Sequence, residues 1–365
     1  MILYFEHISK MLNKKVYITL IVFAIFLSGC SSNQKKYLQQ LPDVPENWST
    51  LYSGDNNSRG WINEFNDKVL FDLVREALEN NKDLGVAFEN VKIARARAGS
   101  SLAPLLPSIS IGAAKSQISS TIKNSNDDIE RVYNYRESLT TQLNWEIDIW
   151  GRLSTRSRAS YLNAKAIYND YDAAKLSIVG LTAQAWYLFC ESKLQADLAQ
   201  RNLDTRLRTL ERVENRYQKG IVQSRDLRLA RSEVESRKAD LLNRNKALSE
   251  AARNLEIIIG RYPSSNISAE NLPILPPKPL LGSPENVLKN RPDIKSSEIQ
   301  LEQAGLEVTA ARLAFLPSLN ITAQWSTSEK DWSDAFDPDR LAGNIIANLT
   351  QSIFQGGTRI AQSKI

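Results

Sequence analysis

The sequence predicts a mixed α and membrane β fold, in which long antiparallel α-helical coiled-coil hairpins are joined to membrane-spanning strands. Three observations lead to this prediction. The chain repeats itself at a spacing of 210 positions, two long stretches are helical, and several short stretches alternate between polar and apolar residues. Together they predict a duplicated unit in which each half holds strands followed by a helical hairpin.

The repeat defines two structural halves. Leu-Pro-Ser-Ile at 106–109 returns as Leu-Pro-Ser-Leu at 316–319, and the same offset pairs Asn80 with Asn290. This spacing is far longer than the ~20–50 residues of a solenoid unit, so it indicates a duplicated half. In both copies a helical stretch runs to a proline, and an alternating stretch follows.

Residues 1–29 are typical of a bacterial lipoprotein signal peptide. Lys14 and Lys15 precede an apolar run that ends in Leu-Ser-Gly-Cys at Cys30. The run is too short for a spanning helix of ~20 residues, and small residues precede the cleavage point. We expect Cys30 to be lipidated, and the following Ser31 resembles lipoproteins of the outer membrane. The alternative is a plain secretory signal with a chance cysteine.

A hairpin of two long helices is predicted over residues 152–260. The first stretch, from Arg152 to Lys219, contains no proline and one glycine, and at ~1.5 Å per residue it reaches roughly 100 Å. Gly220 can adopt the positive φ that ends a helix, and Ser224 can cap the next one. On these helices alone, a generic coiled-coil spacer is the favoured interpretation. The spacing of three and four that is typical of a coiled coil runs near the end of the first helix through Ala199, Leu203, Arg206, Leu210, Val213 and Tyr217. In the second helix it runs through Leu227, Ala230, Val234, Arg237, Leu241, Arg244, Leu248, Ala251, Leu255 and Ile258, eight of which are apolar.

Two pairs of strands are predicted, within residues 107–151 and 317–356, and the alternation is strict from Ser318 to Ser326. Period-2 alternation suits a soluble half-buried sheet, and runs of ~9–11 residues suit a tilted membrane strand equally well. The lipoprotein leader and the tryptophans, which are placed as in aromatic girdles, favour the membrane. The expected lipid-facing residues are Leu143, Trp145, Ile147 and Ile149 in the first pair and Leu319, Ile321, Ala323 and Trp325 in the second, with weaker alternation at Ile109, Ile111, Ala113, Ile345, Ala347 and Leu349.

Four strands are too few to close a membrane barrel, because the smallest known barrels have about eight. An open edge in lipid leaves unpaired backbone groups, each of which costs several kcal/mol. The coiled-coil residues of the helices need neighbours too. We therefore expect a homo-oligomer in which identical chains share one barrel.

Composition excludes several classes of protein. The only histidine, His7, lies in or before the leader, so the mature chain has none for general base catalysis, a Ser-His-Asp triad or a metal site. Cys190 is then a single thiol in an apolar stretch and is expected in the core. The 46 basic and 41 acidic residues are interspersed, unlike a nucleic-acid patch. We predict no catalytic residue, no metal, no cofactor and no nucleic-acid partner.

The order of these parts resembles the TolC-like outer membrane efflux proteins, most closely their lipidated subfamily of the OprM/NodT type. The matching residues are spread over most of the chain. The most specific are Arg-Pro-Asp-Ile at 291–294, upstream of Phe-Leu-Pro-Ser at 315–318. Weaker matches are Asn81–Leu84, Pro107-Ser108, Ile147–Arg152, Tyr217–Gly220 and Leu272-Pro273.

The resemblance implies a homotrimer whose four strands per chain form one twelve-stranded barrel in the outer membrane of a Gram-negative bacterium. The hairpins would continue it as an α-barrel across the periplasm, whose tip meets a periplasmic adaptor (membrane fusion protein) and an inner-membrane pump. The implied function is the passive exit duct of a tripartite drug or xenobiotic efflux pump.

The tip residues that the resemblance singles out are Gly220 and Asp226. Asp226 matches an aspartate whose contacts help to hold the entrance closed in related proteins. A carboxylate in the first turn of a helix also interacts favourably with the helix dipole, and both roles stay open.

The resemblance also assigns the rest of the chain. Residues 30–106 form an N-terminal equatorial segment with the first helices, and 291–316 form the helix of the second repeat. Residues 261–290 form an equatorial linker, expected to be irregular because of its prolines. Residues 357–365 begin a second hairpin. By comparison with the first half, roughly a hundred further residues are expected, so we expect a fragment or truncated form that does not seal a conduit alone.

Two other classes stay open as alternatives. A periplasmic coiled-coil adaptor also has a long hairpin and often a lipobox, but it lacks the duplicated strand–proline signature. A structural or enzymatic lipoprotein of the cell envelope would need, for catalysis, a reactive cluster that is not evident in this sequence.

Overall fold

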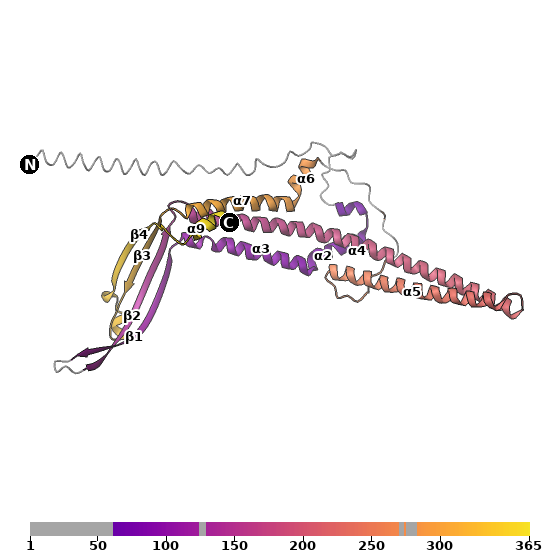
Figure 1. Ribbon diagram of the computed structural model, residues 1–365, viewed down its shortest axis with the longest axis horizontal. Helices are drawn as coiled ribbons and strands as arrows, with labels where there is room; N and C mark the ends of the chain where they lie inside the picture. The colour runs from indigo at the N-terminus through magenta and orange to yellow at the C-terminus, as the bar shows by residue number, and fades with distance from the viewer. Residues whose placement is uncertain (1–60, 124–128, 270–273, 275–282) are drawn as a thin grey trace, which may run out of the picture. The chain divides into compact units, whose positions relative to one another are not determined.

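The computed structural model describes residues 61–123, 129–269, 274 and 283–365, all within one compact unit, Val44–Ile365 (Figure 1). The predicted signal peptide, 1–29, and the predicted lipidation site, Cys30, lie outside the described residues.

The first half opens with three short elements whose boundaries are set by capping side chains. A 3-10 helix, η3 (Trp61–Phe65), precedes helices α2 (Lys68–Asn80) and α3 (Lys82–Ser100). Asp67 accepts hydrogen bonds from the first backbone N–H groups of α2, and Asn81 accepts one from the Leu84 N–H at 2.9 Å. Because these N–H groups have no partner within the helix, the two caps fix where α2 and α3 begin.

Four antiparallel strands form one sheet in the order β1-β2-β3-β4. After the 3-10 helix η4 (Ala103–Leu105) come β1 (Ser108–Lys123) and β2 (Ile129–Ile147); the second half supplies β3 (Ser318–Ser326) and β4 (Ala342–Thr350). Between β3 and β4 lie two short helices, α8 (Trp332–Ala335) and η5 (Pro338–Arg340). Strands of both halves therefore join through the β2–β3 ladder, and β3 spans the same residues as the predicted alternating stretch.

The predicted strand position of Ile149 is wrong, because β2 ends at Ile147. The Asp148 carboxylate accepts hydrogen bonds from the backbone N–H groups of Leu153 at 2.9 Å and Ser154 at 2.8 Å. The chain therefore turns away from the sheet at Asp148 to start the next helix, and Ile149 and Trp150 lie in that turn.

The predicted hairpin of long helices is confirmed. Helix α4 (Arg152–Gln218) has 67 residues and is about 100 Å long at ~1.5 Å per residue, and α5 (Ser224–Ile258) has 35. Helix α4 packs against α5 along the hairpin and against α3 and α7 (Pro292–Leu313) nearer the sheet, as Figure 1 shows. Ser224 is the first residue of α5 rather than its cap, because Gln223 occupies the N-cap position.

The second half repeats the first in its caps and turns. Asn81 precedes α3 and Arg291 precedes α7 at the same offset of 210 positions, and glycines with φ of 75° and 82°, Gly151 and Gly357, precede α4 and α9 (Thr358–Lys364). The predicted irregular linker is partly wrong, because α6 (Pro284–Asn290) is helical. Pro284 is the first helical residue, where its missing N–H costs nothing, and Ser283 caps the helix.

The largest buried cluster joins α2, α4 and α5. Trp186 and Phe189 of α4 are 3% and 2% exposed and pack with Leu70 of α2 and Leu255 of α5. The Trp186 indole N–H donates to Asp67 Oδ2 at 2.8 Å, so the residue that caps α2 also ties it to α4. A smaller cluster, Ala159, Leu162 and Leu306, packs α7 on α4.

Candidate channel-forming site

The strand register places the predicted apolar rows of both halves on one face of the sheet. Leu143 pairs with Ala323, Trp145 with Ile321, and Ile147 with Leu319. The neighbouring ladders add the weaker rows to the same face, because Ile109 pairs with Leu143 and Leu349 with Leu319. This apolar face, as it is called below, consists of Ile109, Ile111, Ala113, Leu139, Leu143, Trp145, Ile147, Leu319, Ile321, Ala323, Trp325, Ile345, Ala347 and Leu349.

The opposite face is polar and nearly uncharged at the same level. In β2 and β3 it presents Gln142, Asn144, Asn320, Thr322 and Gln324. Its charged residue at this level, Glu146, binds Arg152 at 2.6 Å, and this pair lies where the sheet meets α4. The sheet thus has one mainly aliphatic and aromatic face, interrupted by Thr141, and one face mainly of hydroxyls and amides, interrupted by Ile346.

A charged pair marks the end of the apolar face that lies away from the helices. Lys115 of β1 donates to Glu137 of β2 at 2.5 Å, and Glu137 is only 4% exposed. From Ile147 to Leu139 the apolar face extends eight residues along β2, about 26 Å at ~3.3 Å per residue. This is close to the ~25 Å apolar band of an outer membrane barrel.

Both edges of the sheet are open in the part of the chain that the structure describes. There, strand β1 pairs only with β2, and β4 pairs only with β3. About half of the backbone N–H and C=O groups of an edge strand point away from its partner. The chain therefore presents two unpaired strands at opposite edges of one sheet.

Two tryptophans tie the sheet to the turns that open it. The Trp145 indole N–H donates to the Leu105 carbonyl at 3.0 Å, just before β1, and the Trp150 indole N–H donates to the Pro317 carbonyl at 2.7 Å, just before β3. Each bond joins the β2 end to one of the two repeated Leu-Pro turns. Local sequence patterns do not predict these two bonds, because Trp145 and Trp150 lie 40 and 167 positions from their partners.

Asp148 holds the start of α4 at the same junction. Partial burial raises the pKa of this carboxyl, but the hydrogen bonds from the backbone of Ser154 and Leu153 outweigh burial and hold the pKa below its usual value. The ionised carboxylate lies beside the positive end of the α4 dipole, which favours it. The strand-to-helix motif Ile147–Arg152 is therefore a rigid corner.

At the far end of the hairpin, the structure brings the two predicted tip residues into one turn. Gly220 has φ of +70°, as predicted, and lies in open space. Asp226 is exposed in the first turn of α5, and its Oδ2 accepts a hydrogen bond from the Gln223 N–H at 3.3 Å. Asp226 thus has the helix-capping role expected of a first-turn carboxylate, while a gating role stays a prediction.

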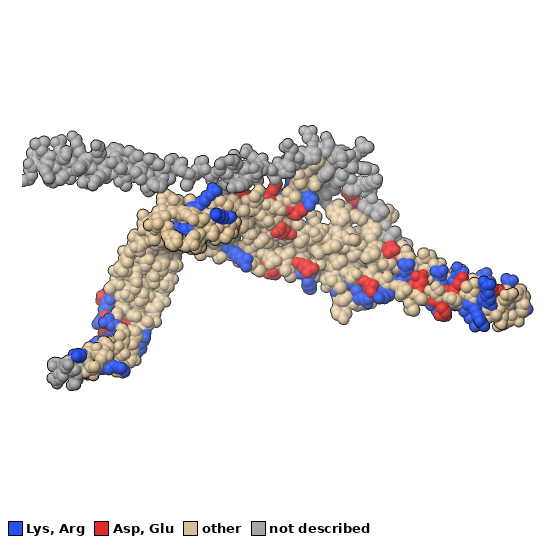
Figure 2. All heavy atoms as spheres, viewed as in Figure 1, with Lys and Arg blue, Asp and Glu red and all other residues tan. Residues whose placement is uncertain are grey.

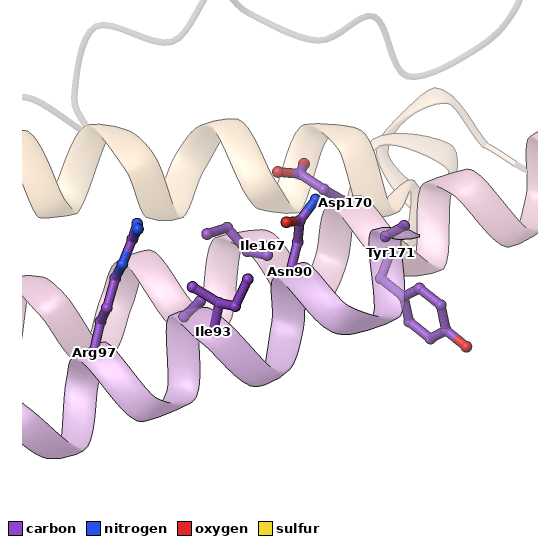
Figure 3. Close-up of a pocket in the computed structure, with 8 residues that line it drawn as sticks. Asn90, Ile93, Arg97, Ile167, Asp170 and Tyr171 are labelled. Carbon is purple, nitrogen blue, oxygen red and sulfur yellow. The ribbon is translucent and has the colours of Figure 1, made fainter. Parts of the chain in front are cut away.

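Grooves run along the packing of α3 on α4. One, of about 340 Å³, lies between Asn90, Ile93 and Arg97 of α3 and Ile167 and Asp170 of α4, as Figure 3 shows. The other, of about 740 Å³, lies nearer the sheet and is lined by small and apolar residues such as Gly99, Leu102 and Ala164 together with the cations Arg95, Arg158 and Lys165. Neither groove gathers a set of reactive side chains.

Residues with reactive chemistry are placed in structural roles. Cys190 is 1% exposed, as predicted for a core residue, and burial raises the pKa of its thiol to about 11. Within the described residues, acidic, histidine and cysteine side chains form no group that could hold a metal ion. In the same part of the chain, no helix combines the length and apolar character needed to cross a bilayer.

This arrangement defines a class of protein: a membrane-type sheet with one apolar and one polar face, open at both edges and continued by a helical hairpin whose longer helix is about 100 Å. Comparison with known proteins identifies the family within this class. Residues 73–261 and 283–365 match the outer membrane efflux protein family. The chain belongs to this family and is an outer membrane protein with the fold of the TolC-like channels.

Individual relatives support this assignment. The chain is 28% identical to the cation efflux system protein CusC of Escherichia coli K12, over 94% of this chain and 75% of CusC. It is 28% identical to the probable outer membrane lipoprotein SilC of Salmonella typhimurium, over 93% of this chain and 74% of SilC. The crystal structure of the CmeC outer membrane channel of Campylobacter jejuni shares the fold, with a TM-score of 0.77 at 24% identity, covering 89% of this chain and 71% of CmeC.

Proposed function

We propose that three copies of this chain form the barrel and part of the helical tunnel of a passive exit duct in the outer membrane, and that this duct is the outer component of a tripartite efflux pump. The observation that carries the proposal is the segregation of the two sheet faces together with the two open edges. Aliphatic and aromatic side chains suit lipid, and hydroxyls and amides suit a water-filled lumen.

The open edges favour a barrel shared among chains. In hydrocarbon, each unpaired backbone group costs several kcal/mol, so an isolated four-stranded sheet is unstable there. Pairing β4 of one copy with β1 of the next removes both edges, and three copies supply twelve strands. Membership of the outer membrane efflux family supports this number.

The helices continue the duct. Their coiled-coil residues are only half-buried around the middle of α5, where Leu241 and Leu248 are partly exposed. Neighbouring hairpins would cover them in an α-barrel. The tip would then meet a periplasmic adaptor, which connects the duct to an inner-membrane pump.

The polar face supports a conduit without catalytic chemistry. Uncharged amides and hydroxyls along the lumen impose little selection by charge, so the choice of cargo would rest with the pump. We propose that the duct itself consumes no energy. The lipid anchor at Cys30 is part of the proposal, and the relationship to SilC, a probable outer membrane lipoprotein, supports it.

Native mass spectrometry and single-channel recording test the proposal together. The full chain, with its leader, is expressed in a Gram-negative host and extracted from outer membranes with a mild detergent. We expect complexes of three copies carrying the mass of an acylated Cys30, and discrete conductance steps in a planar bilayer. Monomers released without detergent, or trimers with no conductance, would contradict the proposal.

A further inference from the structure

We infer that the hairpin tip is a cationic docking surface for a protein partner whose contacting turns carry aspartate and glutamate. This inference rests on the proposed function, because it specifies the chemistry of the partner that meets the duct. Residues 212–231 hold six basic and two acidic side chains, a net charge of +4, whereas the whole chain has +5. Lys and Arg side chains gather at this end of the α4–α5 hairpin in Figure 2.

Most of these cations have no partner in the chain. Within the described residues, the side chains of five form neither an ion pair nor a hydrogen bond: Arg212, Arg216, Lys219, Arg225 and Arg228. These five, called the basic tip, are all exposed. The two nearby carboxylates are already engaged, because Glu214 binds Arg231 at 3.0 Å and Asp226 accepts the Gln223 N–H.

Helix stability explains only part of the basic tip. Arg216 lies in the last turn of α4 and Lys219 at its C-cap, where the helix dipole favours a cation. Arg212 and Arg216 are, however, four residues apart on one face of α4, where like charges destabilise a helix by ~0.2–0.5 kcal/mol. Arg225 lies in the first turn of α5, at the positive end of its dipole, which disfavours a cation. The hairpin itself is closed by other pairs, such as Arg206 with Glu233 at 2.9 Å. Folding therefore does not account for Arg212, Arg225 and Arg228, whereas an anionic partner would account for all five.

Exposed apolar residues among the cations favour a protein partner over a lipid surface or a simple polyanion. Tyr217, Ile221 and Leu229 are 42%, 59% and 58% exposed at the same turn. Apolar and aromatic anchors within a charged rim are typical of protein interfaces. A second copy of this tip is disfavoured as the partner, since two surfaces of net charge +4 repel each other.

Synthetic helical hairpins provide a defined probe. One antiparallel hairpin carries six glutamates in the turns next to its loop, and its twin carries six lysines there. Their binding to the full chain in nanodiscs of neutral lipid is measured at low and high salt. We expect the glutamate hairpin to bind at least about tenfold more tightly than the lysine twin at low salt. We expect this affinity to fall at least about tenfold at high salt, because salt screens exposed charges.

Charge reversal supplies the matched controls. The tip variant Arg216→Glu, Arg225→Glu, Arg228→Glu takes residues 212–231 from +4 to −2 and should reverse the preference between the twins. The control variant Arg201→Glu, Arg237→Glu, Arg253→Glu makes the same total change at exposed, unpaired cations of α4 and α5 outside the tip, and should behave as wild type.

The outcomes separate this inference from the proposed function. The docking inference would be overturned if wild type and the tip variant bound the glutamate hairpin equally tightly. It would also be overturned if wild type bound neither the glutamate hairpin nor the lysine hairpin. If phosphatidylglycerol vesicles displace the glutamate hairpin and bind the tip more tightly, the partner of the basic tip is a membrane and not a protein, and the inference is overturned. Conductance in a planar bilayer, recorded on the same three proteins, tests the duct independently: discrete steps from wild type support the duct whatever the twins bind, and their absence contradicts the duct alone.

Discussion

Substituting arginine at either of two adjacent positions of β3 tests which face of the sheet meets lipid. Ile321 lies on the apolar face between its cross-strand partners Trp145 and Ala347, whereas Thr322 lies on the polar face next to Asn144. Both side chains are half-buried in the same strand, so Ile321→Arg and Thr322→Arg differ mainly in the face that receives the charge.

The expected difference follows from the position of Ile321 in the strand. It pairs with Trp145, two residues from the Ile147 end of the apolar face and two from its middle at Leu143. Arginine costs ~2–4 kcal/mol at the midplane of a membrane barrel and less toward the interfaces, so three copies in one barrel lose up to about 6–12 kcal/mol. Thr322→Arg meets water and loses one weak contact, Thr322 Oγ1 to Asn144 Oδ1 at 3.4 Å, so we expect a cost of about 1 kcal/mol or less.

The assay compares the two variants with wild type in the outer membrane fraction. Trimer yield is read from heat-modifiable mobility on gels, and stability from unfolding in urea in lipid vesicles, followed by tryptophan fluorescence. Ile321→Arg should abolish or strongly reduce trimers, and Thr322→Arg should retain them. Equal effects, or a greater loss for Thr322→Arg, would refute the assignment of the faces.

Two further predictions concern the equatorial region. Gly260→Ala should destabilise the chain by about 2–4 kcal/mol in thermal or urea unfolding, because φ is +80° and the new Cβ would lie 2.4 Å from the Asn80 carbonyl oxygen. Gly220→Ala, with φ of +70° but open space around it, should cost only about 1 kcal/mol, and equal costs would exclude the close approach as the cause. Glu256→Gln should cost about 1.5–3 kcal/mol at neutral pH, because the buried carboxylate accepts backbone hydrogen bonds from Ser265 at 2.7 Å and Asn266 at 2.8 Å. Burial raises the pKa of Glu256, but these bonds outweigh it and leave the pKa below its usual value, so the difference between variant and wild type should shrink as pH falls below about 4. A difference that does not depend on pH would contradict this role.

Regular patterns made most of the fold predictable from the sequence. Alternation located β3 to the residue, and a long stretch with no proline and a single glycine located α4, because both patterns report a repeating backbone geometry. The duplicated Leu-Pro-Ser turn indicated that both halves contribute strands. The positive φ of Gly220 followed from the backbone freedom of glycine, which has no Cβ, at a helix end.

Single hydrogen bonds across long separations were not predictable. Trp150 donates to Pro317, 167 positions away, and nothing in local periodicity specifies that partner. Ile149 continued the alternating pattern although Asp148 had already left the strand to cap α4. The net positive charge of the tip can be counted from the sequence. Only the structure distinguishes Arg231, which is paired with Glu214, from Arg228, which is unpaired within the described residues.

Spin-label accessibility along β3 tests the central claim most directly. Single cysteines from Leu319 to Trp325, in a background in which the buried Cys190 is replaced by alanine, are labelled in reconstituted membranes. Collision with lipid-soluble oxygen and with a water-soluble nickel chelate is then measured at each position. We predict that oxygen contact peaks at the odd-numbered residues and nickel contact at the even-numbered ones. A uniform profile, or nickel contact that peaks at Leu319, Ile321 and Ala323, would contradict a duct whose apolar face meets lipid.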